Sequence, residues 1–600
     1  MIYPTLSELN TSREMIDVFK GYNHNLRIGE GEFYDMTNLT SADYPVLSPR
    51  HKRGIYESPT TPLGMISKDA LCYVDGEDFY INKKKVEGLK LDSNTEKTLV
   101  SMGAYVIIMP DKKWVNTQPY EDETYNHGSI EASEEIKLGS VTLSLCKIDG
   151  DDYSVDNVGA TAPSEPKNMA LWLDTSNIPH TLRQYSATND QWVAIATTYV
   201  KITFSDNLTL NSAFADNDGI TISGFKGVES DGVDLSDFEG TMVAWKVSSN
   251  SVVVKGVLDK TVSLKCSEHP ITITRKMPKM DFIIESGNRL WGCRYGDALN
   301  GEVVNEIYAS KLGDFKNWNS FPGISTDSYV ASVGTDGKFT GAITHLGYPI
   351  FFKENCVHKV YGNYPANYQI QTTTCRGVQD GCSKSLAIVN ETLYYKARSG
   401  VCAYDGSLPV EMSSALGDMT YIDAVAGSLG NKYYISMRDS NEEYNLFVYD
   451  AAKGMWHKED DTQAMQFCNC RGNLYYIDYA DKQIKTIREP ATDSEGDKEA
   501  SPIKWSAITG YIGTETPDKK YISRIDVRLS LEVGTTVTFY AEYDSSGEWE
   551  HLFTKAGTKL GSFSIPVKPK RCDHLRLRIQ GVGNAKIFSI CKNIEQGSDV

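Results

Sequence analysis

Short apolar runs separated by polar turns cover most of the chain, and one unit of this kind recurs between residues 288 and 456. Each copy holds a turn residue, an aromatic and β-branched run, a polar turn, a second run and a glycine turn, which is the pattern of a β-hairpin. The clearest copies are GYPIFFKENCVHKVYG (347–362), NETLYYKARSGVCAYDG (390–406) and GNKYYISMRDSNEEYNLFVYDAAKGMW (430–456). Because the copies follow one another at about 40–45 residues, the repeat predicts a β-propeller.

The repeat also predicts how the chain is divided. Two similar hairpins lie at 69–88 and 103–118, after which the pattern stops. Residues 119–279 are acidic and rich in Thr and Ser, with strand-like runs such as VTLSLCKI and TTYVKITF. The repeats resume at Met280, and RGNLYYIDYADKQIKTIRE (471–489) is the last of them. Two hairpins before the interruption and five after it indicate six or seven blades with an insertion between two of them.

The last hundred residues have a different pattern. Strict apolar and polar alternation at 525–531 and 575–579 is typical of half-buried antiparallel strands, and about six such strands predict a β-sandwich. We therefore expect an all-β chain made of five segments: an N-terminal segment with the first blade strands (1–60), the first part of the propeller (61–118), an inserted β-rich domain (119–279), the second part of the propeller (280–490) and the sandwich (500–600). Near the N-terminus, Thr11 to Glu14 resemble the cap of one short helix over residues 15–19, ended by Gly21.

Composition narrows the setting. No run of about 18 apolar residues exists, so no membrane-spanning helix is expected. The polar start lacks the apolar centre of a signal peptide, which predicts that the chain stays where it is made. Its twelve cysteines are scattered, which favours reduced thiols over a disulfide framework. A net charge of −18 argues against wrapping nucleic acid, but an acidic wall suits a conduit past which phosphates slide.

No catalytic constellation stands out. A nucleophile elbow, a P-loop, a dinucleotide fingerprint and a zinc-protease helix are all absent from the sequence. Asp450 to Trp456 and Asp544 to Trp549 only approximate the Ser-x-Asp-x-Gly-x-x-Trp box of sialidases. Cys468 and Cys470 are closely spaced, but one such pair is weak evidence for zinc. We therefore predict no catalytic residues, no cofactor, no metal and no enzymatic activity.

Several stretches resemble the propeller-type virion proteins of tailed bacteriophages that are called tail nozzle, tail hub or packaged-DNA stabilisation proteins. They are NRLWG (288–292), NEIYAS with DFKNW (305–318), FFKE (351–354), the unit 400–406, the opening NLRIGEGEFYDMTNL (25–39) and the Trp-x-Asp-Thr…Trp module at 170–193. The resemblance implies a ring of subunits, commonly six, in the virion tail. Such a ring continues the portal channel, contacts the portal or adaptor ring and the tail fibres, and holds packaged double-stranded DNA without reading its sequence. It implies assembly in the host cytoplasm, no membrane and no active-site residues.

A second hypothesis is a carbohydrate-binding adhesin or fibre-attachment protein of the same virion. In that case three aromatic residues would stack on sugars: Trp172, Trp192 and Tyr199. Separately, five basic residues within eleven positions form a basic edge on an acidic chain, which predicts a subunit interface: Lys568, Lys570, Arg571, Arg576 and Arg578. Arg576 and Arg578 alternate with Leu575, Leu577 and Ile579, so both should point to the outer face of one strand.

Overall fold

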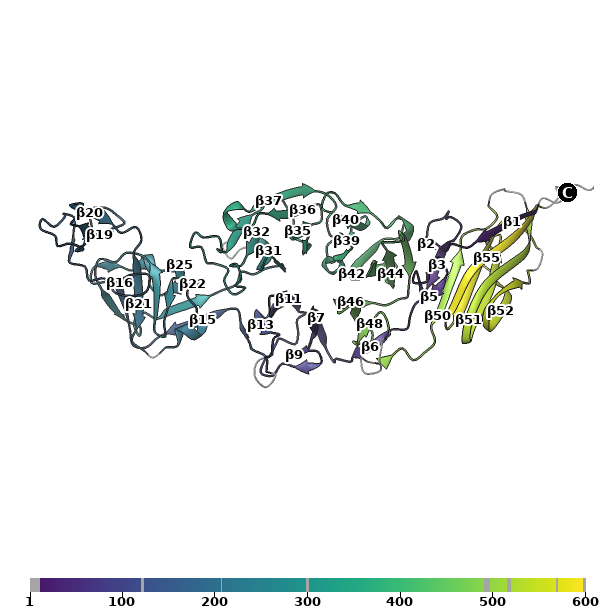
Figure 1. Cartoon of the computed structure of the whole chain (residues 1–600), viewed down its shortest axis with the longest axis horizontal. Helices are drawn as coiled ribbons and strands as arrows, with labels where there is room; N and C mark the ends of the chain where they lie inside the picture. Colours follow the sequence, from purple (N-terminus) through teal and green to yellow (C-terminus); the bar gives the residue numbers. More distant parts are fainter. Residues whose placement is uncertain are drawn as a thin grey trace, which may run out of the picture.

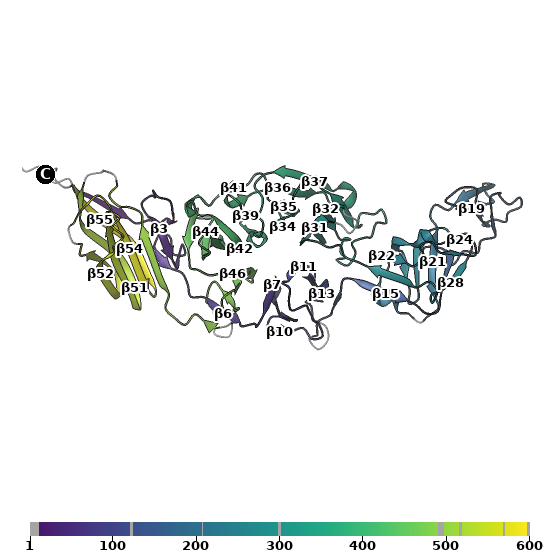
Figure 2. The ribbon, with the colours of Figure 1, turned by 180° about the vertical axis from the view of Figure 1, so that it is seen from behind.

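The computed structural model describes residues 11–119, 124–206, 208–297, 302–489, 497–514, 519–567 and 570–596. Three β domains lie in a row, with the propeller seen face-on in the middle, the inserted domain at one end and the sandwich at the other (Figure 1). The view from behind shows the same succession (Figure 2). Among the described residues, no helix combines the length and the apolar character needed to cross a membrane. The chain is all-β, with one short α-helix, α1 (Leu210–Ala213), in its described part.

Within the described residues, the propeller has seven blades, and each blade contains four antiparallel strands. Blade one contains β7 (Pro62–Lys68), β8 (Ala70–Asp75), β9 (Asp78–Ile81) and β10 (Lys84–Lys85). Blade two contains β11 (Thr98–Met102), β12 (Tyr105–Met109), β13 (Lys113–Asn116) and β14 (His127–Ser129). Blade three contains β30 (Phe282–Ser286), β31 (Arg289–Asp297), β32 (Val303–Ala309) and β33 (Tyr329–Ser332). Blade four contains β34 (Gly341–His345), β35 (Tyr348–Lys353), β36 (Cys356–Tyr361) and β37 (Gln369–Thr374). Blade five contains β38 (Ala387–Val389), β39 (Thr392–Ala397), β40 (Gly400–Tyr404) and β41 (Val410–Glu411). Blade six contains β42 (Tyr421–Leu429), β43 (Lys432–Asp439), β44 (Tyr444–Asp450) and β45 (Met455–Lys458). Blade seven contains β46 (Ala464–Cys470), β47 (Asn473–Asp478), β48 (Ile484–Thr486) and β6 (Gly54–Glu57).

Local sequence explains these blades. The second strand of a blade is covered on both faces by its neighbours, so it reads as a continuous apolar run, such as Ile350 to Phe352 or Leu393 to Tyr395, all fully or nearly fully buried. A tight turn joins it to the first strand. In blade five this turn is Asn390-Glu391, with φ of 47° and 67°, between the paired residues Val389 and Thr392. Both turn residues have positive φ, as a two-residue hairpin loop requires.

The ring closes with a strand from the other end of the propeller sequence. Strand β6 pairs antiparallel with β48 and completes blade seven, so the edge of β48 is covered by a strand from the N-terminal side of the propeller. Beside it, the guanidinium of Arg53 is buried and forms ion pairs with Glu459 (3.0 Å) and Asp460 (2.9 Å). Burial alone would raise the pKa of Asp460, but Arg53 and Arg50 bring it below its ordinary value. Strand β49 (Asp497–Lys498) covers the other edge of β6.

The inserted domain leaves the propeller after β14 and returns at β30. Two sheets enclose the core of this domain. The first sheet contains β15 (Ala132–Ile136), β29 (Ile271–Arg275), β22 (Asp218–Ser223) and β25 (Gly240–Ala244). The second sheet contains β26 (Lys246–Val247), β27 (Ser251–Lys255), β21 (Tyr199–Phe204), β16 (Ser140–Cys146) and β28 (Val262–Lys265). A small distal sheet holds β17 (Asn157–Gly159), β18 (Leu171–Asp174), β19 (Thr181–Ser186) and β20 (Gln191–Ala194), and a short hairpin holds β23 (Glu229–Ser230) and β24 (Val233–Asp234).

Buried polar contacts fix this domain against blade three. Asp218 accepts a hydrogen bond from Asn317 Nδ2 (2.7 Å), and Asn317 Oδ1 accepts one from the backbone N–H of Gly219 (2.9 Å). The other carboxylate oxygen of Asp218 pairs with Arg275 at 2.5 Å. Because Asn317 lies in the connection between β32 and β33, the insertion is docked on the propeller and not merely tethered to it.

The C-terminal domain is a β-sandwich that continues blade six. Its strands run in the order β1 (Thr11–Ile16), β55 (Ala585–Gln596), β51 (Lys520–Tyr543), β54 (Leu575–Val582), β50 (Lys504–Thr509), β3 (Glu32–Thr37) and β2 (Gly21–Tyr22), with β52 (Glu550–Ile565) and β53 (Arg571–Cys572) also paired to β51. Strand β2 in turn pairs with β45, so one hydrogen-bonded sheet joins the two domains. The short pair β4 (Leu39–Thr40) and β5 (Ser48–Pro49) lies near this junction.

The predicted helix over residues 15–19 is wrong. Residues 11–16 form β1, which pairs along its whole length with β55, from Thr11 opposite Glu595 to Ile16 opposite Ile590. The nearly buried ammonium of Lys592 on β55 forms an ion pair with Glu14 (2.8 Å). Pairing with a strand nearly 600 residues away therefore overrides the local capping signal, since tertiary contacts outweigh weak helix propensity.

Candidate functional site

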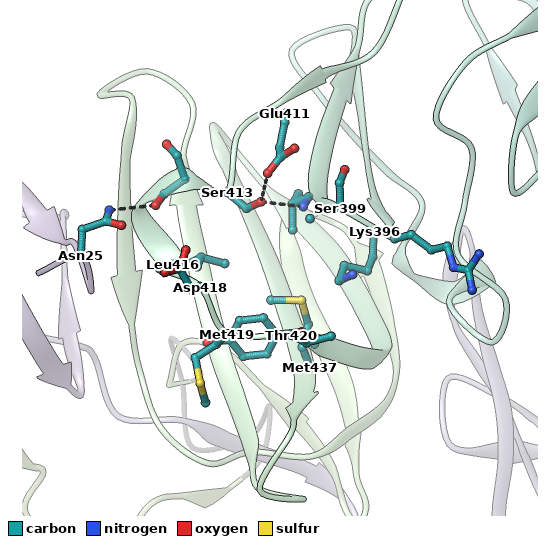
Figure 3. Close-up of a pocket in the computed structure, with 16 residues that line it drawn as sticks. Asn25, Lys396, Ser399, Glu411, Ser413, Leu416, Asp418, Met419, Thr420 and Met437 are labelled. Atoms are coloured by element: carbon teal, nitrogen blue, oxygen red, sulfur yellow. Dashed lines mark hydrogen bonds between the residues drawn. The ribbon is translucent and has the colours of Figure 1, made fainter.

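Among the hollows of the described surface, we single out one formed by blades five and six and the N-terminal segment, which we name the fifth-blade pocket. It has a volume of about 450 Å³. Figure 3 shows side chains of Lys396 on β39, Glu411 on β41 and Met437 on β43. The turn that follows β39, the connection between β41 and β42, and a loop near the N-terminus supply others. Its polar lining includes Asn25, Lys396, Glu411, Ser413 and Asp418.

Lys396 supplies a buried positive charge. It lies near the end of β39, only 2% exposed, and its ammonium donates to the side-chain oxygen of Gln379 (2.8 Å) and to the carbonyl of Ala397 (2.6 Å). No ion pair with a carboxylate is formed by this ammonium within the described residues. Burial lowers the pKa of Lys396.

Ser413 and Glu411 form a second polar group on the rim. The Ser413 hydroxyl accepts a hydrogen bond from the backbone N–H of Val401 (3.0 Å) and lies 3.5 Å from Glu411 Oε1. The other oxygen of Glu411 pairs with Arg376 at 2.9 Å. Gly400 has φ of 155°, and a Cβ there would lie 2.0 Å from Ser413 Oγ, so the approach of the hydroxyl requires a glycine.

The N-terminal segment builds one wall. Asn25 Nδ2 donates to the carbonyl of Ser414 (2.9 Å), and the N–H of His24 donates to the carbonyl of Ala415 (2.8 Å). Sequence reasoning missed this pocket because its walls are almost 400 residues apart and carry no motif. The ammonium, the hydroxyl and the carboxylates of Glu411 and exposed Asp418 suit a polar, hydroxyl-bearing ligand. No cluster of three or more His, Cys, Asp or Glu side chains able to hold a metal occurs in the described ranges.

Four residues of the predicted basic edge, Lys570, Arg571, Arg576 and Arg578, lie apart from this pocket, in the C-terminal domain. Lys568 lies outside the described residues. Lys570 forms an ion pair with Glu550, and Arg571 is exposed. Arg576 and Arg578 do share the outer face of β54, opposite three buried apolar side chains. Arg576 pairs with the nearly buried Glu542 (3.1 Å) and stacks over Tyr511 at 4.8 Å, so its charge is engaged within the domain.

The aromatic residues of the adhesin hypothesis are only partly brought together. Trp172 and Trp192 meet edge to face in the small distal sheet, with ring centroids 5.4 Å apart, and Trp172 is buried. Tyr199 lies on β21 in a different sheet and contacts Trp245. The three rings therefore do not form one continuous surface.

Comparison with known proteins finds structures but no sequence family. No protein-family model matches the chain, and no curated protein matches it. Solved structures similar to it include PorZ, a surface component of the type-IX secretion system of Porphyromonas gingivalis (12% identity, 84% of this chain and 70% of that one, TM-score 0.24). They also include an exo-β-1,3-galactanase from Phanerochaete chrysosporium (10% identity, 52% of this chain and 94% of that one, TM-score 0.19). The Trypanosoma rangeli sialidase is similar as well (10% identity, 98% of this chain and 96% of that one, TM-score 0.20).

These matches correct the prediction that the chain is not an enzyme. That prediction rested on missing motifs, whereas several of the matched structures are glycoside hydrolases and a sialidase. At 12% identity or less and TM-scores of at most 0.24, the matches assign this chain no reaction and no substrate.

Proposed function

We propose that the chain is a structural protein of a tailed-bacteriophage virion, in which copies form a nozzle or hub ring below the portal that continues the DNA channel and retains packaged DNA until ejection. The observation that carries the proposal is the locking of three domains into one body. The insertion is docked through Asp218 and Asn317, and the sandwich shares a sheet with blade six through β2 and β45. Such a subunit presents two distant ends to its neighbours.

The path of DNA in this proposal is the space between subunits and not the axis of each propeller. Lys384, in the connection that leads into blade five, forms an ion pair with Glu96, in the connection that leads into blade two. Its ammonium also donates to the carbonyl of Met465 at the start of blade seven (2.9 Å). Contacts between opposite blades cross the axis, so this end of the axis is occupied by side chains.

Charge supports the same proposal. The chain carries −18 at neutral pH, and an acidic wall repels phosphate. A ring built from such subunits would let DNA pass without gripping its backbone, because strong phosphate binding requires many Lys and Arg contacts.

Electron microscopy of the purified chain, alone and mixed with a portal and adaptor ring, tests the proposal. We expect rings with a central pore in at least the mixture, and virions lacking the chain should lose nuclease protection of their DNA. Monomers in both samples, together with virions that keep their DNA protected without the chain, would contradict it. Monomers that bind glycan arrays would instead support the adhesin.

A further inference from the structure

A second pocket lies at the seam where blade seven meets blade one, next to the closing strand β6, and we name it the seam pocket. It has a volume of about 460 Å³. Blades one and seven are neighbours in the ring, as Figure 1 shows. Among the described residues, its lining has no carboxylate but several cations and amides: Asn82, Lys83, Arg471, Asn473 and Arg488. On a chain with a net charge of −18, a pocket with three cations and no acid is not explained by overall composition.

Each cation comes from a different part of the seam. Lys83 lies in the turn between β9 and β10 in blade one, and its ammonium sits 4.4 Å from the ring centroid of Tyr56 on β6. Arg471 lies in the turn between β46 and β47 in blade seven, and Arg488 follows β48. The pocket therefore exists only when the N-terminal strand has closed the ring.

The positive charges are largely uncompensated. Arg488 is exposed, and its side chain makes no hydrogen bond or ion pair in the described part of the chain. Arg471 donates through Nε to the backbone carbonyl of Asp69 (2.6 Å), which orients its guanidinium without neutralising it. The carboxylate of Glu57 approaches Lys83 only to 3.8 Å, and both side chains are more than a third exposed. At least two positive charges, those of Arg471 and Arg488, thus face the pocket without a counter-ion from the described part of the chain.

We propose that the seam pocket binds a phosphate-bearing small molecule of the size of a nucleotide or a sugar phosphate. Three cations match a group with two or more negative charges better than a single carboxylate, and guanidinium groups bind phosphate oxygens through paired, charge-assisted hydrogen bonds. The volume exceeds what one phosphate needs, and Tyr56 with the amides of Asn82 and Asn473 would contact the rest of the ligand. This inference is independent of the virion proposal.

Isothermal titration of the full-length chain with inorganic pyrophosphate, glucose 1-phosphate, adenosine 5′-diphosphate and glucuronate tests it. We expect the phosphate probes to bind and glucuronate to bind more weakly. Comparing the affinities for glucose 1-phosphate and adenosine 5′-diphosphate shows whether the pocket prefers a sugar phosphate or a nucleotide. A bound probe should also raise the unfolding temperature, since it stabilises the closed ring.

Arg488→Gln should weaken pyrophosphate binding about tenfold or more, because a charge-assisted hydrogen bond is lost. Arg471→Gln is the second variant, and Arg398→Gln, an exposed arginine of blade five, is the control with the same change in charge and unaltered affinity. Undetectable binding of every phosphate probe at millimolar concentration would overturn the proposal. So would equal affinity for glucuronate, or equal affinities of all three variants.

Discussion

Asn317 of blade three and Asp218 of the inserted domain are both almost completely buried and are joined side chain to side chain at 2.7 Å. Asn317→Ala would leave Asp218 Oδ1 and the N–H of Gly219 without these partners. Each buried group left unpaired costs about 1–3 kcal/mol, so we expect a lower unfolding midpoint and faster proteolysis between insertion and propeller. Exposed Asn363→Ala is the control. Equal protease sensitivity of the two variants would show that this contact does not hold the insertion.

The stability of the seam between blades seven and one should depend on the buried ion pairs of Arg53. Arg53→Met removes the cation from Glu459 and Asp460, and an uncompensated buried charge costs about 3–5 kcal/mol. We expect a clear fall in the thermal midpoint, measured by differential scanning calorimetry. Adding Glu459→Gln should restore part of the loss, because it removes one of the unpaired charges. No recovery in the double variant would place the effect of Arg53 elsewhere.

Acid should destabilise the propeller through two buried histidines. Burial, with Lys432 nearby, lowers the pKa of His457 from 6.5 to about 3, and burial with Lys353 nearby lowers that of His358 to about 4. Below pH 6.5 the unfolded chain binds protons at these sites and the folded chain does not. Stability is therefore complete above pH 6.5 and falls as the pH decreases towards the folded pKa values, by about 1.4 kcal/mol per pH unit for each histidine. His457→Gln should reduce the slope of stability against pH between 6.5 and 4.5, measured by urea denaturation. An unchanged slope would mean that His457 is protonated in the folded protein.

The thiols should react in a set order. All twelve cysteines are free, and burial raises the pKa of Cys72 and of Cys146 to about 12. In denaturant we expect twelve thiols to react with a disulfide reagent. In the native protein the partly exposed Cys591 should react before Cys72 and Cys146, because both of these thiols are buried and a reagent cannot reach them without local unfolding. Cys591→Ser should remove the fast phase, and a fast phase that persists would contradict this order.

Arg576→Glu should destabilise the sandwich. The new carboxylate would face Glu542, whose side chain is 5% exposed and now pairs with Arg576. We expect a loss of about 3–5 kcal/mol, as for other broken buried pairs, seen as a lower midpoint in urea. This variant therefore cannot report on assembly alone. Arg524→Glu, whose arginine is 57% exposed, is the control and should have little effect on folding.

The sequence alone predicted the propeller because every blade repeats a local hairpin, and turn chemistry and strand patterning act over a few residues. The hairpin turn at Asn390-Glu391 and the buried strands around Phe351 and Tyr394 can be recognised from the sequence without a structure. The alternation around Arg576 likewise placed both arginines on one face, as β54 has them.

What only the tertiary structure decided are the contacts between segments far apart in the chain. Nothing in residues 54–57 shows that they complete blade seven, and nothing in residues 11–16 shows that they add a strand to β55. Both pockets depend on such closures, since Asn25 meets Ser414 and Lys83 meets the strand of Tyr56 only in the folded ring. Local propensities act within a few residues, whereas a sheet edge can be completed by any strand that the rest of the fold brings to it.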